Sequence, residues 1–131
     1  MDLHILIAEP DHAEAELLET AIAEKLDRAL AGVNIKVKIV STLAAVFAHC
    51  HESNAIIMDL VLDDATEDQV IAAITSLPEP VIIITDIADP AIHARCELAG
   101  ALCVMKSNEI YQAILYSLKK SIRKALTDLP E

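Results

Sequence analysis

The stretch "AIIMDLVLDD", residues 55–64, decides the fold that this sequence predicts. Its first four residues are all apolar and lead directly to Asp59. They lack the alternation of polar and apolar side chains that marks a half-exposed strand, and such a run is typical of a strand buried on both faces of a sheet. A carboxylate at the end of a buried strand requires a cation, a partner or a chemical task. Asp59 is therefore the first candidate functional residue.

Four other short apolar segments, rich in β-branched residues, occur along the chain. They are LHILIA (3–8), IKVKIV (35–40), PVIIIT (80–85) and ALCVMK (101–106). The stretches between them have the apolar periodicity of helices. This alternation is typical of a parallel sheet with helices on both faces. The sequence therefore predicts an α/β fold of the (βα)5 type, with a five-stranded parallel sheet at the centre of three layers.

The helix boundaries have their own signals. Asp11 is expected to cap the first helix, Glu14 three residues later to complete a capping box, and Gly32 to end the helix. Asp89 followed by Pro90 is a strong start signal for the fourth helix. The other helices are expected at 42–49, from 64 or 65 to 77, and after Ser107, the last with apolar residues at 110, 114, 118 and 122.

The length and composition predict one domain without a linker. The 131 residues are expected to form a core over 3–124, with 125–131 as a tail or the start of a linker. A formal net charge of -11 argues against nucleic-acid or anionic-membrane partners. No apolar run approaches the roughly 18 residues of a membrane span, and no basic signal-peptide region precedes the first strand. Three cysteines without regular spacing suggest reduced thiols. A cytoplasmic protein is the resulting expectation.

Charged and polar residues follow the apolar segments where a parallel sheet would present its carboxyl edge. Glu9 and Asp11 follow the first segment, Asp59 lies in the third, Thr85 ends the fourth and Lys106 ends the fifth. Ligands of open α/β sheets bind at this edge. Carboxylate oxygens suit a hard cation such as Mg2+, and a hydroxyl and an ammonium suit the oxygens of a phosphoryl group. The plain alternatives are a structural salt bridge between Asp59 and Lys106, and a Thr85 that only ends its strand.

Five motifs in a fixed order resemble the receiver domains of two-component response regulators. The resemblance extends from Leu3 to about Lys124. The motifs are ILIAEPD (5–11), AIIMDLVLDD (55–64), PVIIITDIADP (80–90), ELAGA (97–101) and VMKS (104–107). Each motif is weak alone, whereas their order is specific. The resemblance implies a flavodoxin-like, doubly wound domain that acts in signalling and is not an enzyme.

The resemblance also implies roles for individual residues. Asp59 would accept a phosphoryl group from a histidine kinase or a phosphotransfer protein, and Thr85 and Lys106 would contact that group. Glu9, Asp59 and the backbone of Val61 would bind Mg2+. The fourth helix, the fifth strand and the fifth helix would form the face that contacts a downstream protein. A homodimer is left open.

The sequence departs from the family at several of these positions. Pro10 falls where the family has the acidic residue that binds the metal directly, and proline has no side-chain oxygen. Asp11 could replace that ligand only if the turn were displaced, so a weakened Mg2+ site is expected. Ser107 replaces the proline that usually follows the lysine, and Leu102 and Cys103 occupy the region of the usual aromatic switch residue.

Three interpretations follow from the sequence. The first is an atypical receiver that is still phosphorylated on Asp59. The second is a pseudo-receiver, in which the same fold serves as a phosphorylation-independent protein-interaction module. The third is a flavodoxin-like enzyme or small-molecule-binding protein, and it is disfavoured because the chain has two glycines and no phosphate-cradling loop.

Overall fold

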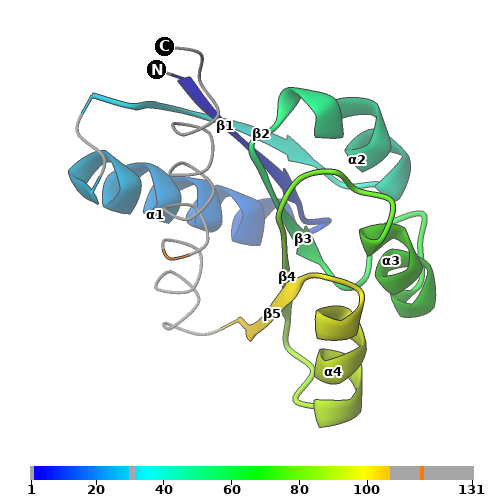
Figure 1. The fold of residues 1–131 in the computed structure, drawn as a ribbon. Coiled ribbons are helices and arrows are strands. Elements are labelled where there is room, and N and C mark those ends of the chain that lie inside the picture. Colours follow the sequence, from blue (N-terminus) through cyan, green and yellow to red (C-terminus); the bar gives the residue numbers. More distant parts are fainter. Residues whose placement is uncertain (1, 30–31, 107–115, 117–131) are drawn as a thin grey trace.

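Five parallel strands form one sheet in the order β2-β1-β3-β4-β5 (Figure 1). The computed structural model describes residues 2–29, 32–106 and 116. The strands are β1 (Asp2–Ala8), β2 (Asn34–Val40), β3 (Ala55–Asp59), β4 (Val81–Thr85) and β5 (Leu102–Met105). All four strand pairs are parallel, as the alternating pattern predicted. Because the chain moves outward from β1 to β2 and then returns to β3 on the other side, the strand order reverses beside β1.

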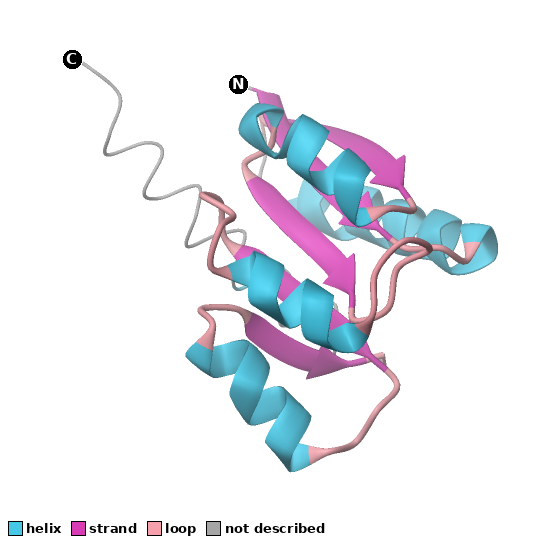
Figure 2. Cartoon of the chain, turned by 90° about the vertical axis from the view of Figure 1, so that its right-hand side faces the viewer, coloured by secondary structure: helices cyan, strands magenta, loops and turns pink. Residues whose placement is uncertain are grey.

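Helices cover both faces of this sheet. They are α1 (His12–Ala29), α2 (Leu43–His49), α3 (Glu67–Ile74) and α4 (Pro90–Leu98), with a 3-10 turn η1 (Cys50–Glu52) after α2. α1 lies on one face, and α2, α3 and α4 lie side by side on the other (Figures 1 and 2). The three-layer, doubly wound, flavodoxin-like fold is thereby confirmed. The helix predicted after Ser107 lies outside the described residues. Within the described part of the chain, no helix combines the length and apolarity that a membrane span requires.

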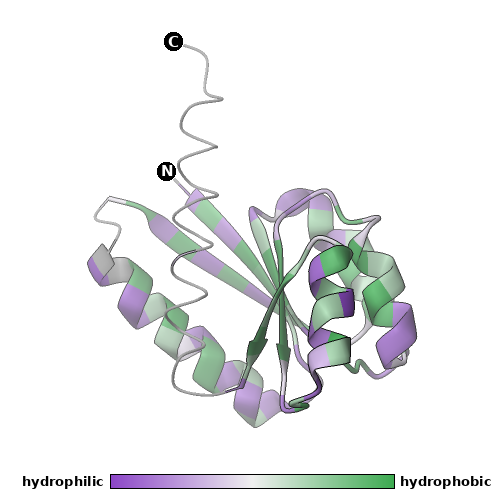
Figure 3. Ribbon diagram, turned by 60° about the horizontal axis from the view of Figure 1, so that its bottom comes forward, coloured by the Kyte–Doolittle hydropathy of each residue, from purple (hydrophilic) through white to green (hydrophobic). Residues whose placement is uncertain are grey.

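The core divides into two apolar clusters, one on each face of the sheet. Alternate residues of the central strands point to opposite faces, so neighbouring positions of β1, β3 and β4 belong to different clusters. Figure 3 shows the strands as largely hydrophobic and the helices as mixed. The cluster under α1 contains residues 3, 5, 7, 18, 22, 26, 55, 57, 82 and 84. The cluster under α2, α3 and α4 includes residues 6, 46, 56, 58, 70, 74, 83 and 96. The sheet is therefore buried on both sides, as predicted.

Most helix boundaries follow the sequence signals, but α3 is shorter than expected. Thr66 caps this helix with Gln69: each side chain hydrogen-bonds the backbone N–H of the other residue. The prediction that the helix begins at 64 or 65 is therefore wrong. Asp64 is the earlier of the two predicted starts, and its carboxylate instead accepts hydrogen bonds from the first turn of α2.

Candidate functional site

The residues singled out at the strand ends meet at the carboxyl edge of the sheet. Glu9 follows β1, Asp59 ends β3, Thr85 ends β4 and Lys106 follows β5. The Lys106 N–H donates to the Thr85 carbonyl at 2.9 Å, which extends the β4–β5 pairing by one residue. The Lys106 Nζ lies 2.6 Å from Oδ2 of Asp59 and 3.1 Å from Oε2 of Glu9. Four separate segments of the chain thus supply one site.

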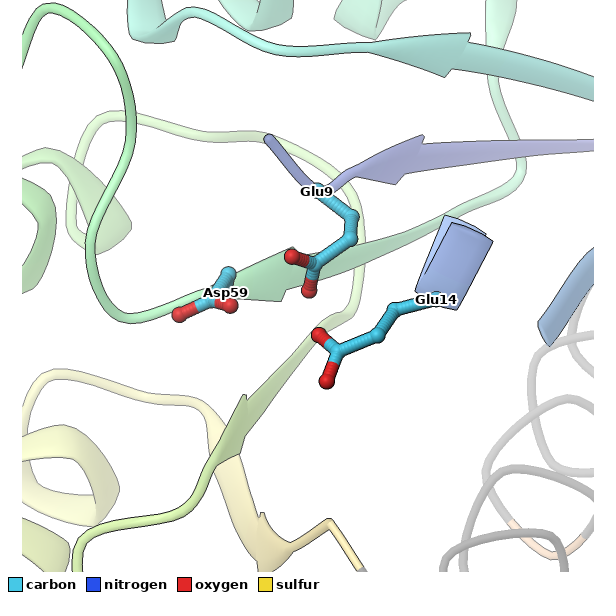
Figure 4. A group of neighbouring side chains, drawn as sticks. All are labelled: Glu9, Glu14 and Asp59. Carbon is cyan, nitrogen blue, oxygen red and sulfur yellow. The ribbon is translucent and has the colours of Figure 1, made fainter. Parts of the chain in front are cut away.

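A third carboxylate, that of Glu14, belongs to the same cluster. Its Oε2 accepts a hydrogen bond from the Lys106 ammonium at 2.8 Å. Carboxylate oxygens of Glu9, Glu14 and Asp59 lie within 4.8 Å of one another. Figure 4 shows their side chains, which come from the end of β1, the first turn of α1 and the end of β3, pointing toward a common centre. The sequence reasoning assigned Glu14 only to a helix cap and missed this position.

The start of α1 explains why Glu14 is free to reach the site. Asp11 caps the helix as predicted, because its Oδ1 accepts from the N–H groups of Ala13 and Glu14 at 2.9 and 3.1 Å. A capping-box Glu14 would bond back to the N–H of Asp11. That N–H instead donates to Oε1 of Glu9 at 3.1 Å. The predicted capping box at Glu14 is therefore wrong, because Glu9 supplies the reciprocal hydrogen bond.

Asp11, which the sequence offered as a substitute ligand, lies outside the carboxylate cluster. Its carboxylate is engaged at the helix start, and the residue is exposed. Pro10, between the two acidic residues, is only partly buried and brings no oxygen from its side chain. The three carboxylates of the cluster therefore come from positions 9, 14 and 59.

Thr85 and Val61 lie at the same edge but contact the site differently. Thr85 is 2% exposed, and its hydroxyl oxygen accepts the N–H of Ile87 at 3.0 Å. The Val61 N–H donates to Oδ1 of Asp59 at 3.1 Å. This bond orients the Asp59 carboxylate, so that Oδ1 faces the β3–α3 loop while Oδ2 faces Lys106.

Burial and mutual repulsion set the electrostatics of the cluster. Burial raises the pKa of Glu9 from 4.5 to about 7, and the neighbouring Asp59 carboxylate adds to this rise. Burial alone would lower the pKa of Lys106. The close carboxylates of Asp59, Glu14 and Glu9 outweigh that effect and raise the pKa above its usual value, so Lys106 stays charged. Three carboxylates face one ammonium, which leaves the cluster rich in negative charge.

The donor set fits a hard divalent cation. Oxygen ligands from carboxylates are those that Mg2+ and Mn2+ take in proteins. Glu9 is 4% exposed, and its Oε2 is buried without a hydrogen-bond partner among the residues that the structure describes. This oxygen is within ion-pair distance of the Lys106 ammonium but outside hydrogen-bond geometry, so one buried acceptor remains incompletely satisfied. A cation at the centre of the cluster would satisfy it.

Comparison with solved structures identifies the fold. The signal receiver domain of a protein named as a Luxo repressor, from Vibrio parahaemolyticus, superposes with a TM-score of 0.81 at 18% identity, over 99% of this chain and 100% of that one. The signal receiver domain of a DNA-binding response regulator (merR) from Colwellia psychrerythraea 34H gives 0.67 at 21% identity, over 91% and 99%. The Mn2+-bound form of response regulator Rcp1 gives 0.65 at 18% identity, over 86% and 88%.

The fold is therefore that of response regulator receiver domains, as the order of motifs predicted. No family model matches the sequence, and no curated protein matches it at a significant level. At such low sequence identity the likeness defines the architecture. The roles of individual residues rest on the geometry of the site.

Proposed function

We propose that this chain is a receiver domain that accepts a phosphoryl group on Asp59. The observation that supports this most is the position of the Asp59 carboxylate, which ends a buried strand within 2.6 Å of the Lys106 ammonium and beside a second carboxylate from the end of β1. A histidine kinase or phosphotransfer protein is the proposed donor.

The proposed step is an in-line transfer. An oxygen of Asp59 attacks the phosphorus of a phosphohistidine, a P–O bond forms and the P–N bond breaks, and the imidazole leaves with the electron pair. Glu9, Asp59 and the backbone of Val61 would hold Mg2+. Its charge would neutralise negative charge on the phosphoryl group during the transfer. Response regulator Rcp1, which has a similar fold, is known in an Mn2+-bound form, and this supports a divalent cation in the proposed function. Lys106 and the Thr85 hydroxyl would contact the phosphoryl oxygens.

The signal would leave through protein contacts rather than through nucleic acid, a membrane or an enzymatic product. Leu98 at the end of α4 is 88% exposed, and Leu102 at the start of β5 is 38% exposed. These apolar side chains support the α4–β5 side as the contact face for a downstream protein. The part of that face expected from the fifth helix lies outside the described residues, and a homodimer through this face is one form of the same proposal.

Incubation with acetyl phosphate and Mg2+, followed by intact-mass measurement, tests the function. One added phosphoryl group is expected in the wild type and in Asp63→Asn, a matched change of an exposed aspartate in the next loop, and none in Asp59→Asn. No adduct at any Mg2+ concentration, together with no stabilisation by beryllofluoride, would exclude the phosphoacceptor role.

A pseudo-receiver is the second candidate. Pro10 favours it, because a proline stands where receiver domains have an acidic residue. Lys106 favours it too, because its ammonium already contacts all three carboxylates. In that case the Lys106 ammonium would be a permanent counter-ion, and the fold would serve protein binding alone. The mass experiment separates the two candidates.

A further inference from the structure

We propose that Glu14 supplies the carboxylate that the acidic turn lacks at Pro10, and thus completes a divalent-cation site with Glu9 and Asp59. The proposal deepens the function described above. What the cation does depends on that function, whereas whether the cation binds does not. The ligand is a hard divalent cation, Mg2+ or Mn2+.

The geometry around Lys106 shows where a positive charge is favoured. Its Nζ lies 2.6 Å from Asp59 Oδ2, 2.8 Å from Glu14 Oε2 and 3.1 Å from Glu9 Oε2. Three carboxylate oxygens from three separate parts of the chain therefore surround the point that the Lys106 ammonium occupies, and a bound cation would take the place of that ammonium. Mg2+ binds oxygen at about 2.0–2.1 Å, so each oxygen would move inward by about 1 Å or less. Glu14 is on the first turn of a helix with its side chain 46% exposed, which leaves it room for this movement.

An independent feature of the site also points to a cation. Oε2 of Glu9 belongs to a side chain that is 3% exposed, and it makes no hydrogen bond with the described residues, because the Lys106 ammonium at 3.1 Å lies outside hydrogen-bond geometry. The Glu9 carboxylate faces those of Glu14 and Asp59 (Figure 4). A buried acceptor without a hydrogen bond is costly unless something satisfies it. A metal ion bound between Glu9, Glu14 and Asp59 would do so.

The local backbone explains why Glu14, and not Asp11, takes this position. Asp11 is held at the helix start by the N–H groups of Ala13 and Glu14. Its own N–H is occupied by Glu9, so Glu14 has no capping hydrogen bond to make. The same hydrogen bond therefore fixes Glu9 at the site and directs Glu14 toward it. An acidic ligand lost from the strand end is replaced by one from the helix.

Mn2+ binding measured by electron paramagnetic resonance tests the proposal without any need for phosphorylation. The decisive variant is Glu14→Gln, which keeps the shape of the side chain and removes its charge. Glu16→Gln is the matched control, because Glu16 is also exposed on α1 and does not belong to the carboxylate cluster. Circular dichroism establishes that each variant is folded.

We expect Glu14→Gln to weaken Mn2+ binding by about tenfold or more, because loss of a supporting group alone typically costs 10–100-fold. Glu16→Gln should bind as the wild type does. The double variant Pro10→Asp/Glu14→Gln should bind Mn2+ more tightly than Glu14→Gln alone. This recovery would support the proposal that Glu14 replaces an acidic ligand at position 10. Equal Mn2+ affinity in Glu14→Gln and the wild type would overturn the proposal, and so would a wild type that binds no Mn2+ at millimolar concentration.

The outcome is independent of the test for phosphorylation. If Mn2+ binding depends on Glu14 while acetyl phosphate never modifies Asp59, the cation site stands and the phosphoacceptor role fails. If Asp59 is phosphorylated while Glu14→Gln binds Mn2+ as the wild type does, the phosphoacceptor role stands and the ligand role of Glu14 fails.

Discussion

The ammonium of Lys106 hydrogen-bonds the carboxylate of Asp59 at 2.6 Å across 47 positions of the chain. The two side chains are only 17% and 15% exposed, so water screens this pair poorly. The bond joins the end of β3 to the residue after β5 across the intervening strand β4. Because Glu9 and Glu14 contact the same ammonium, its removal would leave three carboxylates facing one another.

The variant Lys106→Met should therefore lower the free energy of unfolding by about 2–3 kcal/mol without divalent cations, since removal of one partner of a largely buried pair leaves charge uncompensated. Added Mg2+ should restore more stability to this variant than to the wild type. Urea unfolding with EDTA and with Mg2+ measures both effects. The control is Lys36→Met, which removes an exposed 3.8 Å pair with Asp2 and should cost less than about 0.5 kcal/mol. Equal losses in both variants would contradict the prediction.

The raised pKa of Glu9 predicts a pH dependence of stability. The folded state binds the Glu9 proton more tightly than the unfolded state does, since the pKa rises from 4.5 to about 7. The protonated form therefore stabilises the fold below about pH 4.5, and this contribution is lost as the pH rises to about 7.

The isosteric variant Glu9→Gln removes this titration and keeps an oxygen for the Asp11 N–H. Its free energy of unfolding, relative to that of the wild type, should increase between pH 4.5 and pH 7 in metal-free buffer. Urea titrations at four or five pH values give the comparison. Parallel curves for the two proteins over this range would show that Glu9 does not titrate there.

The thiols give a prediction that concerns the core rather than the site. Cys50, Cys96 and Cys103 are free and buried. Burial raises the pKa of Cys96 and raises that of Cys103 to about 12. Since the thiolate is the reactive form, labelling by a thiol reagent at pH 8 should be at least about tenfold slower in the folded protein than in urea. Intact-mass measurement counts the labelled thiols. Rapid labelling of two or more in the folded protein would contradict the buried positions.

The fold was predictable because its strands carry strong local signals. Runs such as residues 55–58 and 81–84 are apolar at every position, and only a sheet covered on both faces buries all of them. Asp89 and Pro90 fixed the start of α4 in the same way, through a capping side chain and a residue suited to the first helical position. The receiver fold followed from the order of these segments.

The site was only partly predictable, because its contacts depend on competition between alternative hydrogen bonds. Glu14 matched the spacing of a capping box, and the sequence alone does not reveal that Glu9 already occupies the Asp11 N–H. Asp64 likewise suggested the start of α3, whereas its carboxylate bonds another helix 20 residues away. The only signal for Glu14 was its place on the first helical turn after an acidic strand end.

The contact between Asp64 and α2 predicts a role for the loop that follows Asp59. The Asp64 carboxylate accepts the N–H groups of Leu43 and Ala44 at 2.6 and 3.1 Å, which are otherwise unpaired donors of a helix start. These hydrogen bonds lower the pKa of Asp64 below 3.8. The stabilisation is therefore present above pH 3.8 and is lost as the pH falls through the lower folded value.

The variant Asp64→Ala should accordingly unfold at a lower urea concentration than the wild type at pH 7, and the difference should shrink at pH 3. Asp63→Ala is the matched control. Within the described part of the chain, Asp63 hydrogen-bonds only through its backbone N–H, to the Ser41 carbonyl, and the substitution keeps this bond. This control should unfold with the wild type at both pH values. A loss in Asp64→Ala that is equally large at pH 3 would mean that the carboxylate charge does not hold this loop against α2.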